Sequence, residues 1–371
     1  MPTAYATKVA EGFSKKLLKE MYDKNLSGEF VNRDYEGEIN EVGSKLNILA
    51  IDRISEKTYS GSPLTADNLY EKNTQLVIDQ YKSFYWKEKT IDRWKSYIKN
   101  PHSTVVVQKA SERNKNMDQY IFGFYGDVGA GNRVGTDYIT GTVTVDAVTG
   151  VVTGAGTTFT SAMVGRGFKA VGHSTWYRVK AFSSTTSITI EDDLDDSTSA
   201  YTGGAIAGGT AYVIEAATPI AITTSNLLAQ FSYLKLKLDK AESYGFNAVP
   251  DEDRVLVVPP EFESLIVRAQ GVALHVPAVY NDLVKKGFIG ELLGFKIFRS
   301  NRLTGNNTDG YRILGGHTSW MTFAEKLLQS TIEEVLIGDF GQAYKDLFVY
   351  GAKVPDTRRH MMGEVYATFT L

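Results

Sequence analysis

The sequence holds few residues whose types and spacing could do chemistry. Ser96 and Lys99 have the S-x-x-K spacing of a serine nucleophile and a lysine base, but the companion motifs of such enzymes are missing. No Gly-Lys dipeptide is present, which excludes a Walker phosphate loop. Gly129, Gly131 and Gly135 are one residue off the dinucleotide-binding spacing. The absence of cysteine excludes thiolate catalysis, disulfides and cysteine zinc sites.

Candidate metal ligands are also sparse. The histidines are scattered, and none stands beside a carboxylate at ligand spacing: His102, His173, His275, His317 and His360. Asp192, Asp193, Asp195 and Asp196 cluster after an expected strand and could hold a calcium ion, since this cation takes several carboxylate oxygens. The spaced ligands and glycine of an EF-hand loop are missing, so a solvated turn is the favoured interpretation. We therefore predict no catalytic, cofactor-binding or metal residues, and no enzyme.

Composition describes an ordinary soluble protein with room for about two to three domains. Its 371 residues are 43% hydrophobic and 22% charged. A net charge of -3 excludes a strongly cationic nucleic-acid binder. The N-terminus lacks the apolar core of a signal peptide, and no run of about 18 apolar residues occurs. We expect a protein that stays in the cytoplasm of the cell that makes it.

The elements that would position any site begin with an N-terminal arm over 1–45. It opens with a short amphipathic helix whose apolar face carries Val9, Phe13, Leu17 and Leu18. An ordinary N-terminal helix is the alternative. Strands are expected over 44–51 and 73–89, joined by a polar connection. A two-stranded ribbon is not stable alone, so its apolar side needs a neighbour that the chain itself does not evidently supply.

A helix is expected after Pro101, and a β-rich segment follows it. The helical spacing comes from five residues: Val106, Ala110, Met117, Ile121 and Phe124. Residues 129–214 are rich in glycine and threonine, and their period-two alternation predicts an antiparallel β-domain. Its expected core comprises Val143, Val145, Val151, Phe159, Val164, Phe168, Trp176, Val179, Phe182, Ile188 and Ile190.

Helical periodicity resumes after the β-rich segment. Ser225 can cap a helix with an apolar stripe of Leu227, Phe231, Leu234, Leu238 and Ala241. A β-domain between two helical segments is an insertion, so its ends near Gly129 and Ile214 should lie close together and meet the host at exposed turns. We expect it to fold alone and to project from the rest of the protein.

The block 254–303 is the most informative part of the chain. An apolar run over 255–258 predicts a buried strand, which two prolines end. The next helix carries two glutamates near its positive end. A second strand is expected over 295–298. It follows three glycines that allow tight turns, Gly287, Gly290 and Gly294.

This order resembles the axial domain of tailed-phage major capsid proteins, which have the Hong Kong 97-like fold. The family pattern G-x-I-G-x-x-x-G-F-x-I-x-x-S-N is matched by Gly287, Gly290, Gly294, Phe295, Ser300 and Asn301, and Tyr350–Val354 matches its closing Y-G-A-K-V. The resemblance implies an α+β class with six parts. These are an N-terminal arm (1–45), an extended β-loop (46–90), the spine helix and peripheral domain (91–128), an inserted β-domain (129–215), an axial domain (216–345) and returning C-terminal strands (346–371).

The resemblance implies a function in assembly, as the icosahedral shell around double-stranded phage DNA. Partners would be further copies in hexamers and pentamers, a scaffolding protein, the portal and a decoration protein, with DNA as non-specific contents and no membrane. The location would be the virion, with assembly in the host cytoplasm. Because the chain starts at Met1 with the arm, we expect no fused scaffold. Lys57 and Lys72 lie where some relatives place a cross-linking lysine, but no acceptor is identifiable, so we expect no cross-link.

Two alternatives remain open. An encapsulin-like shell for cargo enzymes shares the fold, although the phage-type β-domain argues against it. A β-rich adhesin or glycan-binding protein would explain residues 129–214 but not the arm or the axial block.

Finally, Arg358, Arg359 and His360 form a short basic patch that we interpret as a salt-bridge donor between subunits and not as a DNA site.

Overall fold

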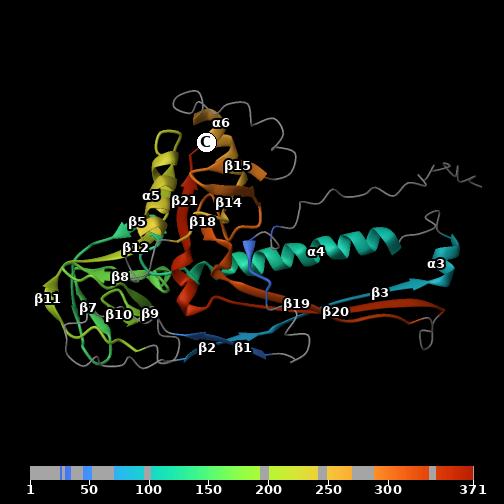
Figure 1. The fold of residues 1–371 in the computed structure, drawn as a ribbon, viewed down its shortest axis with the longest axis horizontal. Coiled ribbons are helices and arrows are strands. Elements are labelled where there is room, and N and C mark those ends of the chain that lie inside the picture. Colours follow the sequence, from blue (N-terminus) through green and yellow to red (C-terminus); the bar gives the residue numbers. More distant parts are fainter. Residues whose placement is uncertain are drawn as a thin grey trace, which may run out of the picture.

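A computed structural model describes residues 26, 30–34, 45–51, 71–95, 102–192, 200–240, 249–269, 288–333 and 340–370. Figure 1 shows an upright central sheet with two helices beside it, a β-rich unit on one side, and a long sheet with a long helix on the other. The mixed helix and sheet content agrees with the predicted α+β class. The predicted N-terminal helix lies outside the described residues.

The central sheet is mixed and holds most of the core. Its strands run in the order β13 (Ile220–Ile222), β21 (Met362–Phe369), β18 (Gly310–His317), β14 (Arg254–Val258), β16 (Phe295–Arg299) and β15 (Phe288–Leu292). Two short strands extend it: β17 (Gly305–Asn306) pairs with β18, and β4 (Arg133–Val134) pairs with β21. Every residue of β14 is buried, as a continuous apolar run predicts. The two strands predicted at 255–258 and 295–298 are confirmed.

Two helices pack beside this sheet. Helix α6 (Pro260–Ala269) begins directly after β14 and carries Glu261 and Glu263 in its first turn, where acidic side chains favour the helix dipole. Helix α5 (Leu227–Lys240) buries four residues of the predicted stripe, while Ala241 lies outside the described residues. The Ser225 hydroxyl lies 2.9 Å from the Thr223 hydroxyl, and the Asn226 side chain accepts from the Thr223 N–H at 2.8 Å. The side chain that closes this turn is therefore Asn226, and the Ser225 cap is wrong.

The long sheet consists of β19 (Thr322–Glu333), β20 (Gly341–Lys353) and β3 (Gln80–Lys89), all antiparallel. Helix α4 (His102–Phe122) runs along it (Figure 1). The Arg113 guanidinium lies 4.9 Å from the Phe348 ring centre, and Lys109 forms an ion pair with Asp346.

The apolar stripe predicted for α4 is buried only near the C-terminal end of the helix. Met117 and Ile121 are buried, whereas Ala110 is exposed. The helix ends at Phe122, so Phe124 falls in the 3-10 turn Gly123–Asp127. The side chain of Val106 is not among those described.

The ribbon predicted at the start of the chain is present, but it does have a partner in its own chain. Strands β1 (Lys45–Ile51) and β2 (Glu71–Val77) pair antiparallel, and β3 continues from β2 after a two-residue break. Apolar side chains of the ribbon pack with β19 and β20 in one cluster, Leu46, Ile48, Leu76, Ile78, Ala324 and Val349. The expectation that the ribbon lacks a neighbour within its chain is therefore wrong for the described part.

Gly351 of β20 is what lets the ribbon cross the long sheet. A Cβ at this position would come within 2.9 Å of the Ile78 Cα and closer still to the Val77 carbonyl oxygen. Both are backbone atoms that no rotamer change can move away. The glycine of the Tyr350–Val354 segment therefore provides the space for a backbone crossing.

The β-rich unit is one antiparallel sheet with its own core. Its strands are β5 (Thr136–Tyr138), β6 (Thr142–Val145), β7 (Val151–Ala155), β8 (Gly167–Ala170), β9 (Tyr177–Ser184), β10 (Ser187–Asp192), β11 (Ile206–Thr210) and β12 (Tyr212–Thr218). They run in the order β11-β6-β7-β10-β9-β8-β12-β5. The cluster of buried residues inside the unit is separate from that of the central sheet.

Four of the residues predicted for this core do not lie fully inside it. Val164 and Phe182 are exposed, and Trp176 and Val151 are half-buried. Val152 takes the inward position instead, because it pairs with Ile188 across the β7–β10 ladder. Register shifts on both sides of Ile188 and Thr189 interrupt the period of two along β9 and β10, so a strict alternation assigns Phe182 to the wrong face.

We predict that Gly351→Ala lowers the free energy of unfolding by about 1–3 kcal/mol, the usual cost of overpacking. The added methyl group meets the Val77–Ile78 backbone and pushes the ribbon off β20. Urea unfolding measures the effect. Gly126→Ala is the matched control, because a methyl group there meets nothing within 4 Å. Equal stability of the two variants would contradict the crossing as the reason for this glycine.

Candidate functional site

The described residues offer no metal centre. No group of three or more histidine, aspartate or glutamate side chains converges within this part of the chain. Asp192 accepts a hydrogen bond from the Thr202 hydroxyl at 2.6 Å. The other three aspartates of that cluster lie outside the described residues, as do Ser96, Lys99 and His275. The solvated turn expected at the aspartates therefore stays a prediction.

The prediction of an exposed basic patch at 358–360 is wrong. Arg359 and His360 are buried, and Arg359 pairs with Asp356 at 3.0 Å. Arg358 donates a hydrogen bond to the Ser319 carbonyl at 3.0 Å, within its own chain. These residues fall in a 3-10 helix (Asp356–Met361) that packs inside the protein, which a run of charged letters does not reveal.

A buried network of charged residues joins the β-rich unit to the central sheet. Glu364 of β21 accepts from Arg133 (3.1 Å), Arg166 (2.7 Å) and Arg312 (3.0 Å). Glu215 of β12 accepts from Arg133 at 3.0 Å. Arg133, Glu215 and Glu364 are at most 1% exposed. One guanidinium therefore holds together two carboxylates that are far apart in sequence.

The charged side chains of this network also form hydrogen bonds with backbone groups. Arg133 also donates to the carbonyls of Gly126 (3.0 Å) and Val128 (2.7 Å), and Glu215 accepts from the Gly131 N–H at 2.8 Å. Burial raises the pKa of both Glu215 and Glu364, and the Arg133 charge acts in the opposite direction. Removing one partner of such a network costs about 3–5 kcal/mol, because the other charge stays buried.

This network corrects one expectation and supports another. The Gly131–Glu215 hydrogen bond brings the two ends of the β-rich unit together, as expected. The contact with the rest of the protein is nevertheless a buried ion cluster and not a set of exposed turns. The available signal was a glutamate inside each of two apolar strands, YVIEAAT and MGEVYATF, which sequence reasoning overlooked.

A second candidate surface lies at the far end of the long sheet. Three large apolar side chains are exposed there, Ile91 (58%), Trp94 (83%) and Phe340 (83%), which we call the apolar tip. Helix α3 (Thr90–Lys95) carries two of them, and the Thr90 N–H donates to the Phe340 carbonyl at 3.0 Å. Just inside the tip, Trp86 stacks on Tyr344 with ring centres 4.2 Å apart.

Exposed apolar side chains of this size are typical of protein interfaces. Tyr81 and Tyr85 add to the exposed aromatic area along β3. Scattered apolar residues are ordinary on a surface, but an exposed Trp and Phe at one end of a sheet favour a partner that covers them. No helix among the described residues is long and apolar enough to cross a membrane.

We predict that His360 makes folding stability fall below pH 6.5. Burial lowers its pKa to about 4, whereas the unfolded chain binds a proton near pH 6.5. The unfolded state therefore gains a proton first, and stability is lost as pH falls from about 6.5 towards 4, by at most roughly 3 kcal/mol.

Urea unfolding from pH 4 to pH 7 measures this slope. His360→Gln should flatten the slope between those two values. His173→Gln changes an exposed histidine and should leave the slope as it is. The same pH slope in wild type and His360→Gln would show that this residue does not cause it.

The comparisons with known proteins agree with this fold. A family model described as phage capsid protein matches residues 189–360, a little less than half of the chain. No curated protein matches. Among solved structures, one from Mycobacterium phage Che8 has a TM-score of 0.57 at 20% identity, covering 99% of this chain and 98% of that one.

Two cyanophage structures give the same result. The capsid structure of cyanophage P-SCSP1u has a TM-score of 0.57 at 14% identity, with 98% and 94% of the two chains covered. The capsid asymmetric unit of cyanophage Pam1 has a TM-score of 0.56 at 11% identity, with 99% of each chain covered. At these identities the likeness shows the fold. The chain thus has the fold of phage capsid proteins, and the resemblance to tailed-phage major capsid proteins that its motifs predicted is confirmed.

Proposed function

We propose that this chain is a major capsid protein whose copies assemble into a closed icosahedral shell around packaged double-stranded phage DNA. The observation that carries the proposal is the likeness to phage capsid structures over nearly the whole length of both chains. The role is structural and not enzymatic. We infer a place in the virion, after assembly in the host cytoplasm with a scaffolding protein and a portal.

The parts of the Hong Kong 97-like fold have natural counterparts here. We assign α4 and the long sheet to the peripheral domain, the central sheet with α5 and α6 to the axial domain, and the β-rich unit to an inserted domain. Strands β1 and β2 form the base of the extended loop. Its connecting segment, 52–70, lies outside the described residues.

This arrangement suits assembly because the parts that would grip a neighbour stand away from the core. The apolar tip lies at the far end of the long sheet, remote from the β-rich unit (Figure 1). Burying a large apolar side chain contributes about 1.5–3 kcal/mol. Several such contacts per subunit, repeated around a symmetry axis, hold each copy against all its neighbours at once. The net charge of -3 gives the wall little affinity for the DNA inside.

We predict that Trp94→Ser combined with Phe340→Ser reduces shell yield at least tenfold while leaving the unfolding midpoint of the unassembled protein within about 2 °C. Both side chains are 83% exposed, so the subunit core does not use them. Negative-stain microscopy and sedimentation measure the yield. Val148→Ser removes an equally exposed apolar side chain (85%) from the β-rich unit and serves as the control. Normal shells from the double variant would remove the tip from the assembly contacts.

We also predict that shortening the chain between Ser55 and Glu71 abolishes shells but preserves cooperative unfolding. The base of the ribbon stays packed on Ala324 and Val349, so the subunit retains its fold. Sedimentation and thermal unfolding of the same sample separate the two outcomes.

In assembled wild-type shells we expect no covalent cross-link through Lys57 or Lys72. A ladder of joined subunits on a denaturing gel would contradict this.

A further inference from the structure

A broad cavity lies on the long sheet between the ribbon and the apolar tip, and we call it the sheet hollow. It has a volume of about 510 Å³. Binding sites usually measure about 300–1,000 Å³, so the hollow is large enough to receive a partner's side chains. Two strands line it, β3 with Ser83, Phe84 and Tyr85, and β20 with Lys345, Asp346 and Leu347.

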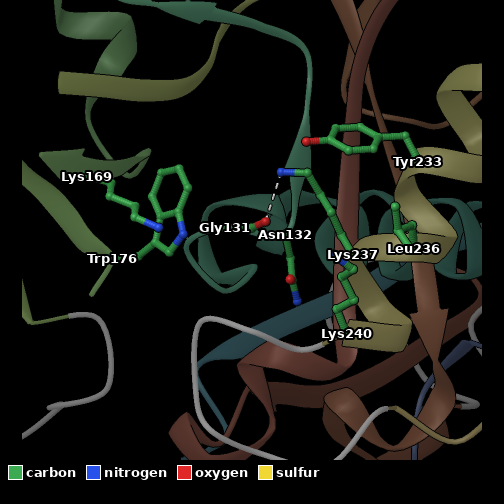
Figure 2. Close-up of a pocket in the computed structure, with 8 residues that line it drawn as sticks. All are labelled: Gly131, Asn132, Lys169, Trp176, Tyr233, Leu236, Lys237 and Lys240. Atoms are coloured by element: carbon green, nitrogen blue, oxygen red, sulfur yellow. Dashed lines mark hydrogen bonds between the residues drawn. The ribbon is translucent and has the colours of Figure 1, made fainter. Parts of the chain in front are cut away.

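Another cavity, between the β-rich unit and helix α5, is a seam between two parts of one subunit. Figure 2 shows Lys169 and Trp176 of the β-rich unit on one side of it and α5 on the other. The Lys237 amine of α5 donates to the Gly131 carbonyl at 2.9 Å, the hydrogen bond drawn in Figure 2. This seam has a volume of about 180 Å³, which is below the size of a usual binding site. The sheet hollow is therefore the stronger candidate.

The register of the strands shows which face of the long sheet carries the hollow. Residues that pair across an antiparallel ladder point to the same face, as Tyr85 and Lys345 do here. Val349 lies on that face too, because side chains two residues apart point the same way, and it packs against the ribbon. Helix α4 covers the opposite face, where Lys109 pairs with Asp346. The ribbon thus covers one half of this face, and the hollow lies on the other half.

The lining of the hollow suits an aromatic side chain. Tyr85 is 53% exposed, and Tyr81, next to the ribbon, is 60% exposed. The Lys87 amine lies 5.7 Å from the Tyr85 ring centre. A lysine amine attracts the electron-rich face of an aromatic ring, and tryptophan gives the strongest attraction. An incoming indole would therefore pack on Tyr85 and Leu347 and meet a cation beside them.

The subunit carries such a side chain at its apolar tip. Trp94 is 83% exposed, and Ile91, one turn earlier on helix α3, is 58% exposed. Trp94 therefore does not fill the hollow of its own chain. Each copy offers a protruding indole and a separate hollow that suits one, which is the condition for a contact between two different patches of identical subunits.

We propose that the sheet hollow of one copy receives Trp94 from the apolar tip of a second copy. Such a contact repeats from copy to copy and closes into a ring where the rotation per copy allows it. One indole buries roughly 150–250 Å². A stable interface needs about 1,200–2,000 Å², so this contact sets the register of a larger interface and rests on the proposed shell function.

The chain has no cysteine, so engineered cysteines report this contact by disulfide formation. Ser83→Cys marks the hollow, and Thr90→Cys marks the tip, one helical turn from Trp94. Within one chain the two positions are roughly 20 Å apart at the usual rise per residue, which is too far for a disulfide. We expect assembled particles of the double variant to give a ladder of joined copies on a non-reducing denaturing gel.

The single variants and the tryptophan test the partners. Ser83→Cys and Thr90→Cys should each run as monomers, and the two mixed before assembly should give dimers and nothing larger. In the particles that form, adding Trp94→Ala to the double variant should reduce the ladder at least fivefold, whereas Trp94→Phe, which keeps a ring, should reduce it less than twofold. Thr90→Cys with Val148→Cys, an exposed position of the β-rich unit, is the control and should give no ladder.

The outcomes separate this contact from the shell function. Normal particles without a ladder overturn the contact and leave the shell function standing. Absence of particles contradicts the shell function, and the double variant is then oxidised as concentrated soluble protein, where absence of a ladder overturns the contact as well. Dimers of Thr90→Cys alone would place two tips together, and dimers of Ser83→Cys alone would place two hollows together. Either of these results also overturns the proposal.

Discussion

The buried guanidinium of Arg133 is the interaction on which the arrangement of this subunit depends. It joins Glu215 of the β-rich unit to Glu364 of the central sheet, and it also holds two backbone carbonyls of the turn that follows α4. All three major parts of the fold therefore meet at one side chain. A rigid fork with five donors can do this, whereas a lysine ammonium could not.

Such a cluster specifies geometry more than it adds stability. Desolvating the two carboxylates and the guanidinium costs several kcal/mol per ion, and the ion pairs offset this only when every donor and acceptor is matched. The matching needs the β-rich unit in one orientation, with Arg166 reaching Glu364 and its guanidinium lying 5.3 Å from the Tyr366 ring centre. Apolar packing alone would tolerate a sliding contact. The ion cluster does not, so it fixes the angle at which the unit stands.

Sequence reasoning succeeded where a pattern is local. The apolar run at 255–258, the stripe of α5 and the alternation in the β-rich unit each depend on neighbours within a few residues, and the structure has these elements. It failed where distant segments decide. Burial of Arg359 and His360 depends on how the 3-10 helix packs, and the exposure of Phe182 depends on register shifts between β9 and β10. The Arg133–Glu364 contact joins residues 231 positions apart, which no periodicity can indicate.

The continuity of β20 has a mechanical consequence. Its 13 residues run from the apolar tip to the buried Ala352 without a break, a length of about 40 Å at the usual rise per residue. A strand of this length acts as a lever whose fulcrum is the crossing at Gly351. A tilt of about 5° there displaces the tip by roughly 3–4 Å, by the same rise per residue. Small changes of angle near the core are thus converted into changes in the position of the tip, which would let one subunit meet neighbours at more than one curvature in the proposed shell.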